Sequence, residues 1–521
     1  MKKGYLALVL HAHLPYIRHL NPDGALEEDW LYEAIIETYV PILQMLFQLE
    51  KDDIPVRLSL SLTPPLLNML SDQLLMDRFS KRLDLLCELA EKEVKRTAGS
   101  WPFSETALIY KDLLKNTRIC LERYNGDLIT GFRYYAEHGS LEILASAATH
   151  GFLPLMEITP GCQKAQISQG VAEHKRFFKK KPLGFWLPEC GFIPGVDRLL
   201  ADAGVRYFLT DTHGVLHANV RPRYANYAPI YTTNSVAAFG RDLESSKQVW
   251  SATEGYPGDY DYRDFYRDIG YDLDYEYLRS LLDPIGIRKM TGFKYHRITG
   301  PSDYKEPYVP NNARAKAKLH AANFIFNREA QIKHLNGLMD RPPIIVAPYD
   351  AELFGHWWFE GPYFLEEVIR LAHNSSLVEL ITPGDYLTLH PKNQVATPSA
   401  SSWGYNGYNE VWLEGSNEWI YRHLHEAGWQ LAKLAKQDEM SDLKRRILNQ
   451  AARELLLAES SDWAFIMKTG TVSDYAVKRT KEHLANFFSL LKSLETPDLT
   501  LLERLESLNP IFPQIDYRIF A

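Results

Sequence analysis

The chain has 521 residues, of which 45% are hydrophobic and 24% are charged, and its net charge is −8 at pH 7. This length suggests more than one domain, and the hydrophobic content allows a large core. The modest negative charge argues against a nucleic acid or an anionic membrane surface as a partner.

The N-terminal segment resembles a signal peptide only superficially. Its apolar run, Tyr5–Leu10, is short, and His11, His13 and Pro15 follow it without a small-residue cleavage site. We therefore predict a buried strand. No run reaches the roughly 18 apolar residues of a membrane helix. The four cysteines lie far apart without a CxxC motif, which is typical of a reducing compartment. We expect a cytoplasmic protein.

Several short apolar runs end in polar residues. They are continuous rather than alternating, as in strands buried on both faces of a parallel sheet. Helical stretches such as 31–48 and 66–92 separate them. The pattern predicts a βα barrel or an open α/β sheet, whose functional residues gather at the carboxyl ends of the strands. The polar residues at these ends are His11, His13, Thr63, Glu189, Thr212, His213 and Asp350.

Beyond the barrel-like part, the texture of the sequence changes. The segment Leu389–Ser402 is rich in Pro, Ser and Thr and is typical of a linker. Helical patterns without strand alternation follow it to the end, which predicts a helical domain of about 120 residues. The Gly-, Tyr- and Asp-rich segment Glu254–Asp272 is long for a connector, and we expect it to cover a site.

His11 and His13 lie two residues apart on a predicted strand, so their side chains face the same way. Three interpretations stay open on spacing alone. In the first, the pair binds a metal ion, with Asp211 and His213 as further ligands. In the second, the pair donates hydrogen bonds to a polar ligand. In the third, the two rings only satisfy buried carbonyl groups.

Glu189 and Asp350 each follow an apolar run and precede a loop rich in aromatics and glycine. A carboxyl group at the end of a buried strand is partly desolvated, which raises its pKa and suits it to acid catalysis. Two facing carboxyl groups match the needs of glycoside cleavage. The alternative is that each caps a helix or pairs with a buried cation. The abundance of Trp and Tyr fits a sugar ligand, because flat rings stack on pyranoses, and it fits a large core equally well.

Seven ordered motifs resemble a known family. "HAHLPY", "GSLEILASAATHGFLPLM", "WLPECGF" and "APYDAELFGHWWFEG" resemble the signature regions of glycoside hydrolase family 57. "VWSATEGYPGDYDYRDFYRDIGYD", "SSWG" and "SSDWAFIMKTG" narrow the resemblance to its 1,4-α-glucan branching enzyme subgroup. It implies an α/β fold, a distorted (β/α)7 barrel over 1–395 with a mainly helical insertion at roughly 66–125. A helical domain over 396–521 would contribute to the cleft.

The resemblance also implies roles for individual residues. Glu189 matches the nucleophile and Asp350 the general acid/base of a retaining enzyme that needs no metal or cofactor. His11 and His13 are then better interpreted as hydrogen-bonding to sugar hydroxyls. The implied partner is an α-glucan such as amylose or glycogen. The expected substrate-binding residues are His11, His13, Trp30, Arg267, Trp357, Trp403, Trp412 and Asp462.

One region departs from the family pattern. Branching members often carry a long glycine-rich loop with a tyrosine at its tip, which shields the covalent intermediate from water. The corresponding segment here, Val215–Asp242, contains a single glycine near its end, Gly240, besides candidate tyrosines Tyr227 and Tyr231. A short loop would let hydrolysis compete with transfer.

The sequence thus predicts a retaining 1,4-α-glucan branching enzyme. Same-chemistry alternatives are an α-amylase or a 4-α-glucanotransferase, which differ in the acceptor. A metal-dependent polysaccharide deacetylase using His11, His13 and Asp211 is a rival from another class. A non-catalytic glycan-binding protein is a third, although it would have no use for the carboxylate pair.

Overall fold

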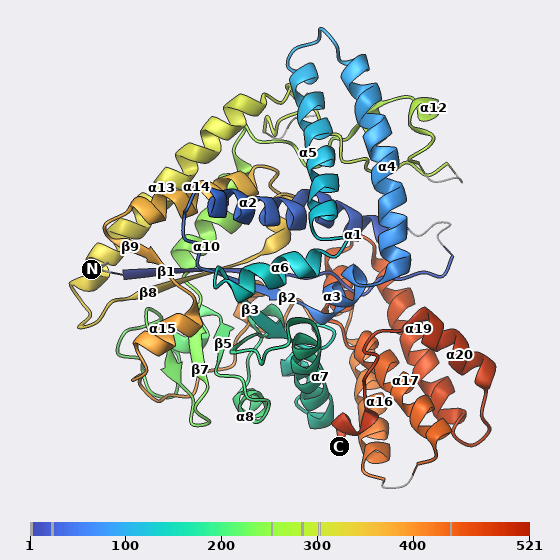
Figure 1. The fold of residues 1–521 in the computed structure, drawn as a ribbon. Coiled ribbons are helices and arrows are strands. Elements are labelled where there is room, and N and C mark those ends of the chain that lie inside the picture. Colours follow the sequence, from blue (N-terminus) through green and yellow to red (C-terminus); the bar gives the residue numbers. More distant parts are fainter. Residues whose placement is uncertain are drawn as a thin grey trace.

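A computed structural model describes residues 4–21, 26–251, 254–282, 286–300, 302, 304–437 and 440–521. At its centre, seven parallel strands within these ranges follow one another to form a curved sheet (Figure 1). Their order is β7, β5, β4, β3, β2, β1, β8. Their bounds are β1 (Gly4–Ala12), β2 (Leu58–Leu62), β3 (Leu141–Ser146), β4 (Gly184–Trp186), β5 (Tyr207–Thr210), β7 (Ala237–Gly240) and β8 (Ile344–Asp350).

A backbone hydrogen bond joins the two ends of this sheet. The backbone N–H of Asp242, just after β7, donates to the carbonyl of Val346 in β8 at 2.8 Å. Two short strands add to the edges: β6 (Ile230–Tyr231) runs antiparallel to β7, and β9 (Val378–Leu380) runs parallel to the start of β1. The predicted distorted seven-stranded barrel is therefore confirmed, and the open-sheet alternative is wrong.

The sequence of the strands explains their place in the core. β1 (GYLALVLHA) and β8 (IIVAPYD) are apolar on both faces, and nearly every side chain in them is buried. Helices cover the outside of the barrel, as expected for a parallel sheet. These helices are α1 (Glu28–Ala34), α2 (Val40–Lys51), α6 (Leu128–Glu137), α7 (Pro160–Phe178), α8 (Val196–Asp202), α9 (Thr212–Leu216), α10 (Leu243–Trp250), α13 (Pro310–Asn336), α14 (Gly361–Asn374) and α15 (Pro383–Leu389). Between α1 and α2 the helix widens into a π-helical turn, η1 (Ile35–Tyr39).

A long helical hairpin projects from one side of the barrel (Figure 1). It follows the short helix α3 (Pro64–Leu70) and consists of α4 (Gln73–Arg96) and α5 (Phe103–Arg123). In α4, Leu75, Phe79 and Leu83 recur at helical spacing and are buried. The segment that carries α11 (Ile269–Asp272) and α12 (Tyr275–Leu278) lies beside the hairpin.

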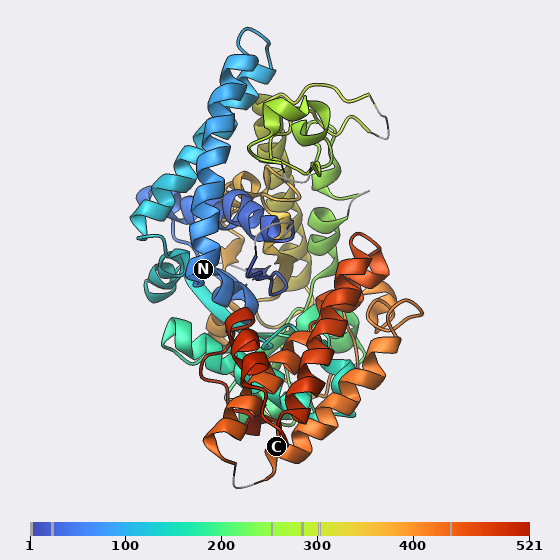
Figure 2. The ribbon, with the colours of Figure 1, turned by 90° about the vertical axis from the view of Figure 1, so that its right-hand side faces the viewer.

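The C-terminal part is helical, as predicted, and packs against α7 below the barrel (Figure 2). Its helices are α16 (Trp419–Ala435), α17 (Asp442–Ala458), α18 (Ser461–Thr469), α19 (Ser473–Lys492) and α20 (Leu499–Leu508). The domain boundary at 395/396 and the insertion at roughly 66–125 stay predictions.

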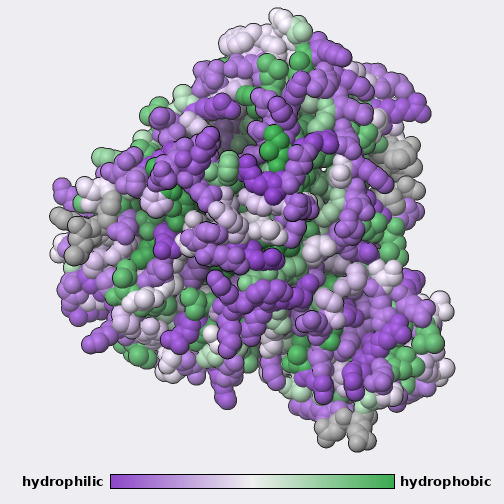
Figure 3. Space-filling view, viewed as in Figure 1, coloured by the Kyte–Doolittle hydropathy of each residue, from purple (hydrophilic) through white to green (hydrophobic). Residues whose placement is uncertain are grey.

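Hydrophilic residues cover most of the face seen in Figure 3, with hydrophobic residues scattered among them. In the described part of the chain, no helix is both long enough and apolar enough to span a membrane.

Candidate active site

Polar side chains that could do chemistry follow the carboxyl ends of the parallel strands. His11 and His13 end β1, Thr63 follows β2, and Asp350 is the last residue of β8. Parallel strands place these ends at one edge of the barrel, where the active sites of such folds lie. Glu189 joins them from the turn after β4.

The turn that carries Glu189 has an unusual backbone. Glu189 (φ 60°) and Cys190 (φ 52°) both adopt the left-handed conformation, which costs roughly 1–3 kcal/mol at a residue with a side chain. Backbone hydrogen bonds hold the turn. The Cys190 N–H donates to the Leu187 carbonyl at 2.9 Å, and the backbone N–H of Trp403 donates to the Glu189 carbonyl at 3.0 Å. A strained conformation held by the surrounding structure is common at catalytic positions.

Two side chains donate hydrogen bonds to the Glu189 carboxyl group. The Trp403 indole Nε1–H reaches Oε2 at 2.8 Å, and the Ser461 hydroxyl reaches Oε1 at 3.0 Å. Both residues lie in the C-terminal part of the chain. Two donors aimed at the carboxyl oxygens favour its ionised form.

Burial acts in the other direction on both predicted catalytic carboxyl groups. It raises the pKa of Glu189, which the Trp403 and Ser461 hydrogen bonds only partly offset. Burial raises the pKa of Asp350 well above its usual range, and the charges of Glu352 and Glu189 raise it further. Among the described residues, no donor bonds the Asp350 carboxyl. Asp350 is thus the group suited to hold a proton, and Glu189 is the one suited to be an anion.

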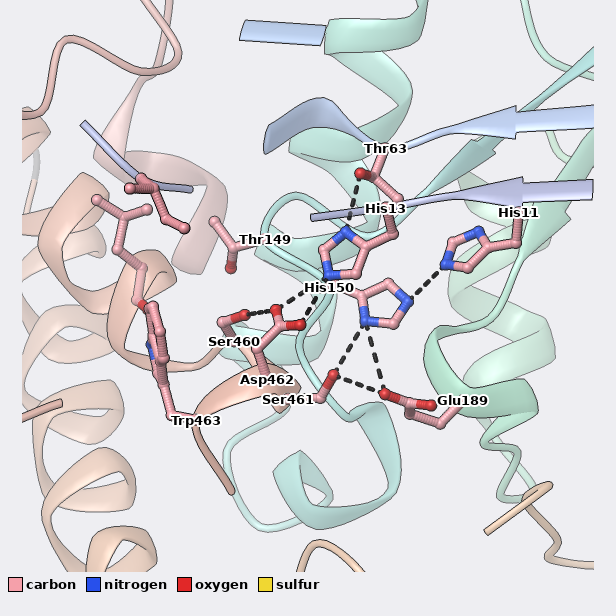
Figure 4. Close-up of polar contacts among 12 residues, drawn as sticks. His11, His13, Thr63, Thr149, His150, Glu189, Ser460, Ser461, Asp462 and Trp463 are labelled. Atoms are coloured by element: carbon pink, nitrogen blue, oxygen red, sulfur yellow. Dashed lines mark hydrogen bonds and ion pairs between the residues drawn. The ribbon is translucent and has the colours of Figure 1, made fainter. Parts of the chain in front are cut away.

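Three histidines stack beside Glu189 (Figure 4). The ring centroid of His150, in the loop after β3, lies 4.9 Å from that of His11 and 3.9 Å from that of His13, and the centroids of His11 and His13 lie 5.8 Å apart. His11 also lies flat on Trp186 at 4.3 Å. Burial and the neighbouring rings lower the pKa of His11 and of His150 well below the usual value, so both are neutral at neutral pH.

His13 differs from the other two histidines because it faces carboxylates. Its Nε2 lies 2.9 Å from Asp462 Oδ2, and its Nδ1 lies 2.9 Å from the Thr63 hydroxyl. Burial disfavours a charged ring here, yet the Asp462 carboxylate raises the pKa of His13 above its usual value. Its backbone N–H donates to Glu352, a residue whose pKa burial raises to about 7. The predicted site residues His13 and Asp462 are thus in direct contact.

The ligand atoms of His13, His150 and Asp462 lie within 4.8 Å of one another, close enough to hold a metal ion. We assign no ion to them, because both ring nitrogens of His150 already bond residues outside this group, His11 and Ser461. Asp211 and His213, weighed above as further ligands, lie elsewhere. Asp211 pairs with Arg241 at 2.6 Å and with the His213 ring, whose other nitrogen bonds the Gly407 carbonyl.

The two tryptophans predicted to line the cleft differ in exposure. Trp403 is half-buried and stacks on Trp250. Trp412 is 1% exposed, and its ring packs flat on Phe152 at 4.3 Å. The backbone of Gly404 covers the Trp412 ring, leaving no room even for a methyl group. Trp412 therefore cannot stack on a sugar in this conformation, and its contacts fit the alternative that it joins the C-terminal part to the barrel.

Replacing Trp412 should therefore affect stability rather than specificity. We expect Trp412→Ala to lower the free energy of unfolding by about 3–5 kcal/mol, the usual cost of truncating a buried aromatic. The ratio of branches formed to reducing ends released should stay that of the wild type. Thermal unfolding and product analysis of the same preparation check both quantities. A changed ratio at unchanged stability would contradict this assignment.

The structure does not bring the other predicted residues into contact with Glu189. Trp30 packs edge-on against Tyr475, and Arg267 pairs with Asp272 within its own segment at 3.0 Å. Trp357 is 52% exposed and stacks on Phe265, whereas its neighbour Trp358 is buried. Gly355 (φ 116°) lets this loop pass directly over the carbonyl of Glu37 in η1.

Tyr227 and Tyr231 lie at the opposite edge of the barrel. The Tyr227 carbonyl accepts from Ile344 at the amino end of β8, and Tyr231 pairs with Ala237 at the amino end of β7. The segment between them and α9 is held by the bonds of Asn219 to Thr397. This placement gives neither tyrosine a position over the carboxyl pair.

Sequence reasoning missed His150, Ser461 and Glu352 as site residues. His150 lies in "GSLEILASAATHG", where a strand is followed by a polar residue, the pattern that singled out Glu189 and Asp350. Ser461 directly precedes Asp462 at the start of α18. Its role depends on a contact across 272 residues of sequence, which no local pattern reveals.

A parallel barrel with two partly buried carboxyl groups at the carboxyl edge of its strands, one of them held by donors, is the arrangement expected of an enzyme that acts on glycosidic bonds. A model of glycosyl hydrolase family 57 matches residues 7–398, and a model of the 1,4-alpha-glucan branching enzyme C-terminal region matches residues 423–520. The chain belongs to glycosyl hydrolase family 57.

Relatives and solved structures match nearly the whole chain. A 1,4-alpha-glucan branching enzyme of Thermococcus kodakarensis is 32% identical, over 98% of this chain and 78% of the relative. The crystal structure of a branching enzyme from Pyrococcus horikoshii is 31% identical, with a TM-score of 0.89 over 100% of this chain and 97% of that one. The crystal structure of the alpha-amylase AmyC from Thermotoga maritima is 44% identical, with a TM-score of 0.94 over 100% and 99%.

Proposed function

We propose that this protein is a retaining 1,4-α-glucan branching enzyme. It cleaves an α-1,4 bond in amylose or glycogen, keeps the donor piece on Glu189, and passes it to a 6-hydroxyl to form an α-1,6 branch. Asp350 protonates the leaving 4-oxygen and then takes the proton of the incoming 6-hydroxyl. The family and the names of the relatives support the reaction class.

One observation carries the assignment of roles. Glu189 receives two hydrogen bonds, from Trp403 and Ser461, whereas the partly buried Asp350 carboxyl receives none in the described part of the chain. A nucleophile must be ionised and an acid must be protonated at the same pH. The difference in their partners supports this division of labour.

Product analysis on amylose tests the proposal. The protein is incubated with amylose, and α-1,6 linkages are counted by proton NMR beside the reducing ends. Branches that rise with few new reducing ends support transfer to a 6-hydroxyl. New reducing ends without branches would overturn it.

Hydrolysis of the same substrate is the second candidate function. It is favoured by the segment Val215–Asp242, which runs from the carboxyl edge of the barrel back to the amino edge and bonds Asp340 and Gln394 there. A segment held at that edge cannot shield a covalent intermediate at the other edge from water. AmyC, which is 44% identical to this chain, is named an alpha-amylase. We propose that hydrolysis accompanies branching, and the same product analysis measures the ratio.

Trp403 should matter for both the nucleophile and the acceptor. We expect Trp403→Ala to lower branching about ten-fold or more, because stacking of a sugar on the indole is worth roughly 1–3 kcal/mol by analogy with base stacking. Hydrolysis should fall less, because water needs no platform. Trp403→Phe keeps a ring but not the Nε1 donor, so it should restore part of the transfer. An equal loss of both activities in Trp403→Ala would contradict the platform role.

Chelation separates this function from the deacetylase alternative. We expect full activity on amylose after exhaustive treatment with EDTA and removal of bound metal, because both ring nitrogens of His150 bond His11 and Ser461. Loss of activity with recovery on adding Zn²⁺ would contradict this expectation. Any turnover by the wild type rules out the non-catalytic binder.

We further propose an α-glucan as the partner and the cytoplasm as the location, without nucleic acid or membrane partners. The four cysteines, all unpaired, support a reducing compartment.

A further inference from the structure

We propose that a directed chain of hydrogen bonds orients the Glu189 carboxyl group and holds it ionised. This hydrogen-bond chain starts at Ser61 on strand β2 and passes through His11 and His150. Ser461, at the start of helix α18, then donates the last bond to Glu189. Its members, Ser61, His11, His150 and Ser461, would be positioning residues. Their catalytic meaning rests on the function proposed above.

The contacts are continuous, and Figure 4 shows the three links that run from His11 through His150 and Ser461 to Glu189. The four links measure 3.1 Å from Ser61 Oγ to His11 Nδ1, 2.9 Å from His11 Nε2 to His150 Nε2, 2.9 Å from His150 Nδ1 to Ser461 Oγ, and 3.0 Å from Ser461 Oγ to Glu189 Oε1. All four members are at most 3% exposed. The first three links are therefore shielded from competing water, whereas the last one ends on the partly buried Glu189.

The direction follows from the number of protons available. An ionised Glu189 can only accept, so the single hydroxyl proton of Ser461 goes to it. Ser461 Oγ must then accept from His150, which places the proton of that neutral ring on Nδ1. His150 Nε2 is bare and accepts from His11.

The same reasoning fixes the start of the chain. His11 carries its proton on Nε2, so its Nδ1 accepts from the Ser61 hydroxyl. Every dipole then points toward the Glu189 carboxylate, and aligned hydrogen bonds strengthen one another. If Glu189 is protonated, Ser461 is free to donate to His150 and the chain can run the other way. The charge on Glu189 thus sets the tautomers of both histidines.

This arrangement changes the predicted role of His11. Both of its ring nitrogens are bonded to protein groups, and the side chain is 2% exposed. It has no free donor for a sugar hydroxyl. Its effect on the reaction passes through His150 and Ser461 to the nucleophile.

Other ionisable groups also face Glu189 and must be counted in any titration. The Asp462 carboxylate raises its pKa, and His13 lowers it. His150 Nδ1 lies 3.8 Å from Oε1, and Asp350 interacts with Glu189 electrostatically. A variant that changes only the hydrogen-bond chain leaves these charges in place.

The Trp403 indole reports the charge of Glu189 directly, because its Nε1–H bonds the carboxyl at 2.8 Å. In protein labelled with ¹⁵N-tryptophan, its NMR signal, identified by its loss in Trp403→Phe, should shift with pH as Glu189 titrates. The titration should vanish in Glu189→Gln. This measurement needs no substrate.

Removing the last link should raise the midpoint of this titration. We expect a rise of about one pH unit in Ser461→Ala, because a hydrogen bond to a charged group is lost. His150→Leu, which has no donor, should shift the midpoint in the same direction. His150→Asn keeps an N–H at the position of Nδ1 and should stay within about 0.3 unit of the wild type.

The neighbouring Ser460 gives a matched control, because its hydroxyl bonds Asp462 instead of Glu189. Ser460→Ala should move the midpoint by less than about 0.3 unit. The proposal would be overturned if the titration midpoint of Ser461→Ala equalled that of the wild type, or if the Asn and Leu variants of His150 shifted the midpoint equally. Should His150→Leu fold poorly, His11→Gln and His11→Leu make the same comparison one link earlier, since Gln keeps a donor near Nε2.

The two proposals fail in different ways. If the wild type forms no α-1,6 branches, the proposed function fails while the indole titration still decides the hydrogen-bond chain. If branches form but Ser461→Ala titrates as the wild type does, only the chain fails. The acid limb of kcat/KM for amylose cleavage should move together with the NMR midpoint.

Discussion

Glu189→Gln is expected to abolish both cleavage of amylose and branching, with a loss on the order of 10⁴- to 10⁶-fold, as for other covalent nucleophiles. An amide cannot form the glycosyl ester, although it keeps the size of the carboxyl group. The left-handed turn should persist, because its backbone bonds do not involve the changed atoms. Release of reducing sugar and formation of α-1,6 linkages are measured together.

Glu459 offers a matched control for this change. It is another buried glutamate next to α18, but its carboxyl accepts from Gln166 and it does not contact Glu189. Burial raises its pKa to about 7, so a neutral glutamine resembles the form partly present at neutral pH. Glu459→Gln should keep most of the activity. Comparable losses in the two variants would show a packing effect and remove Glu189 from its role.

Asp350→Ala is expected to separate two substrates. Cleavage of amylose should fall by about 10³-fold, within the range for loss of a general acid. Cleavage of α-glucosyl fluoride should fall far less, because fluoride leaves without a proton. The glycosyl–enzyme formed from the fluoride would lack its base, so a burst followed by slow turnover is expected. Equal losses on both substrates would contradict the role of Asp350.

The pH dependence gives a second check on Asp350. Burial raises its pKa, so the acid stays protonated to a higher pH than an ordinary aspartate and activity is lost only as pH rises through the raised value. The basic limb of kcat/KM on amylose should therefore depend on this residue. In Asp350→Asn, the residual activity on the fluoride should show no such limb.

Local patterns were enough to predict a parallel α/β sheet with polar residues at its carboxyl edge, whereas the choice of a barrel came from the family resemblance. The buried runs of β1 and β8 are apolar on both faces, so continuous hydrophobicity identified them as strands of a parallel sheet. A polar residue after such a run lies at the carboxyl edge by geometry alone. This rule found Glu189 and Asp350, and it would have found His150 if the run ending at Ser146 had been followed further.

Contacts between distant segments could not be predicted in this way. Ser461 reaches Glu189 because the start of α18 lies on the loop after β3, where Ser461 N–H donates to the His150 carbonyl at 3.1 Å. Trp412 was expected in the cleft because of the family resemblance. Its burial depends on Phe152, which belongs to the barrel part of the chain. Exposure is a property of such tertiary contacts and not of the loop sequence.

Both side chains that donate hydrogen bonds to the proposed nucleophile, Trp403 and Ser461, belong to the last quarter of the chain, whereas Glu189 itself belongs to the barrel. The hydrogen bonds to the Glu189 carboxyl group therefore form only when the C-terminal region is docked on the barrel. Mild denaturant or heat that loosens this docking should abolish activity while the barrel is still folded. Sequence changes in the two regions are coupled for the same reason. Replacing the C-terminal region with that of a relative would change the hydrogen-bond donors around Glu189.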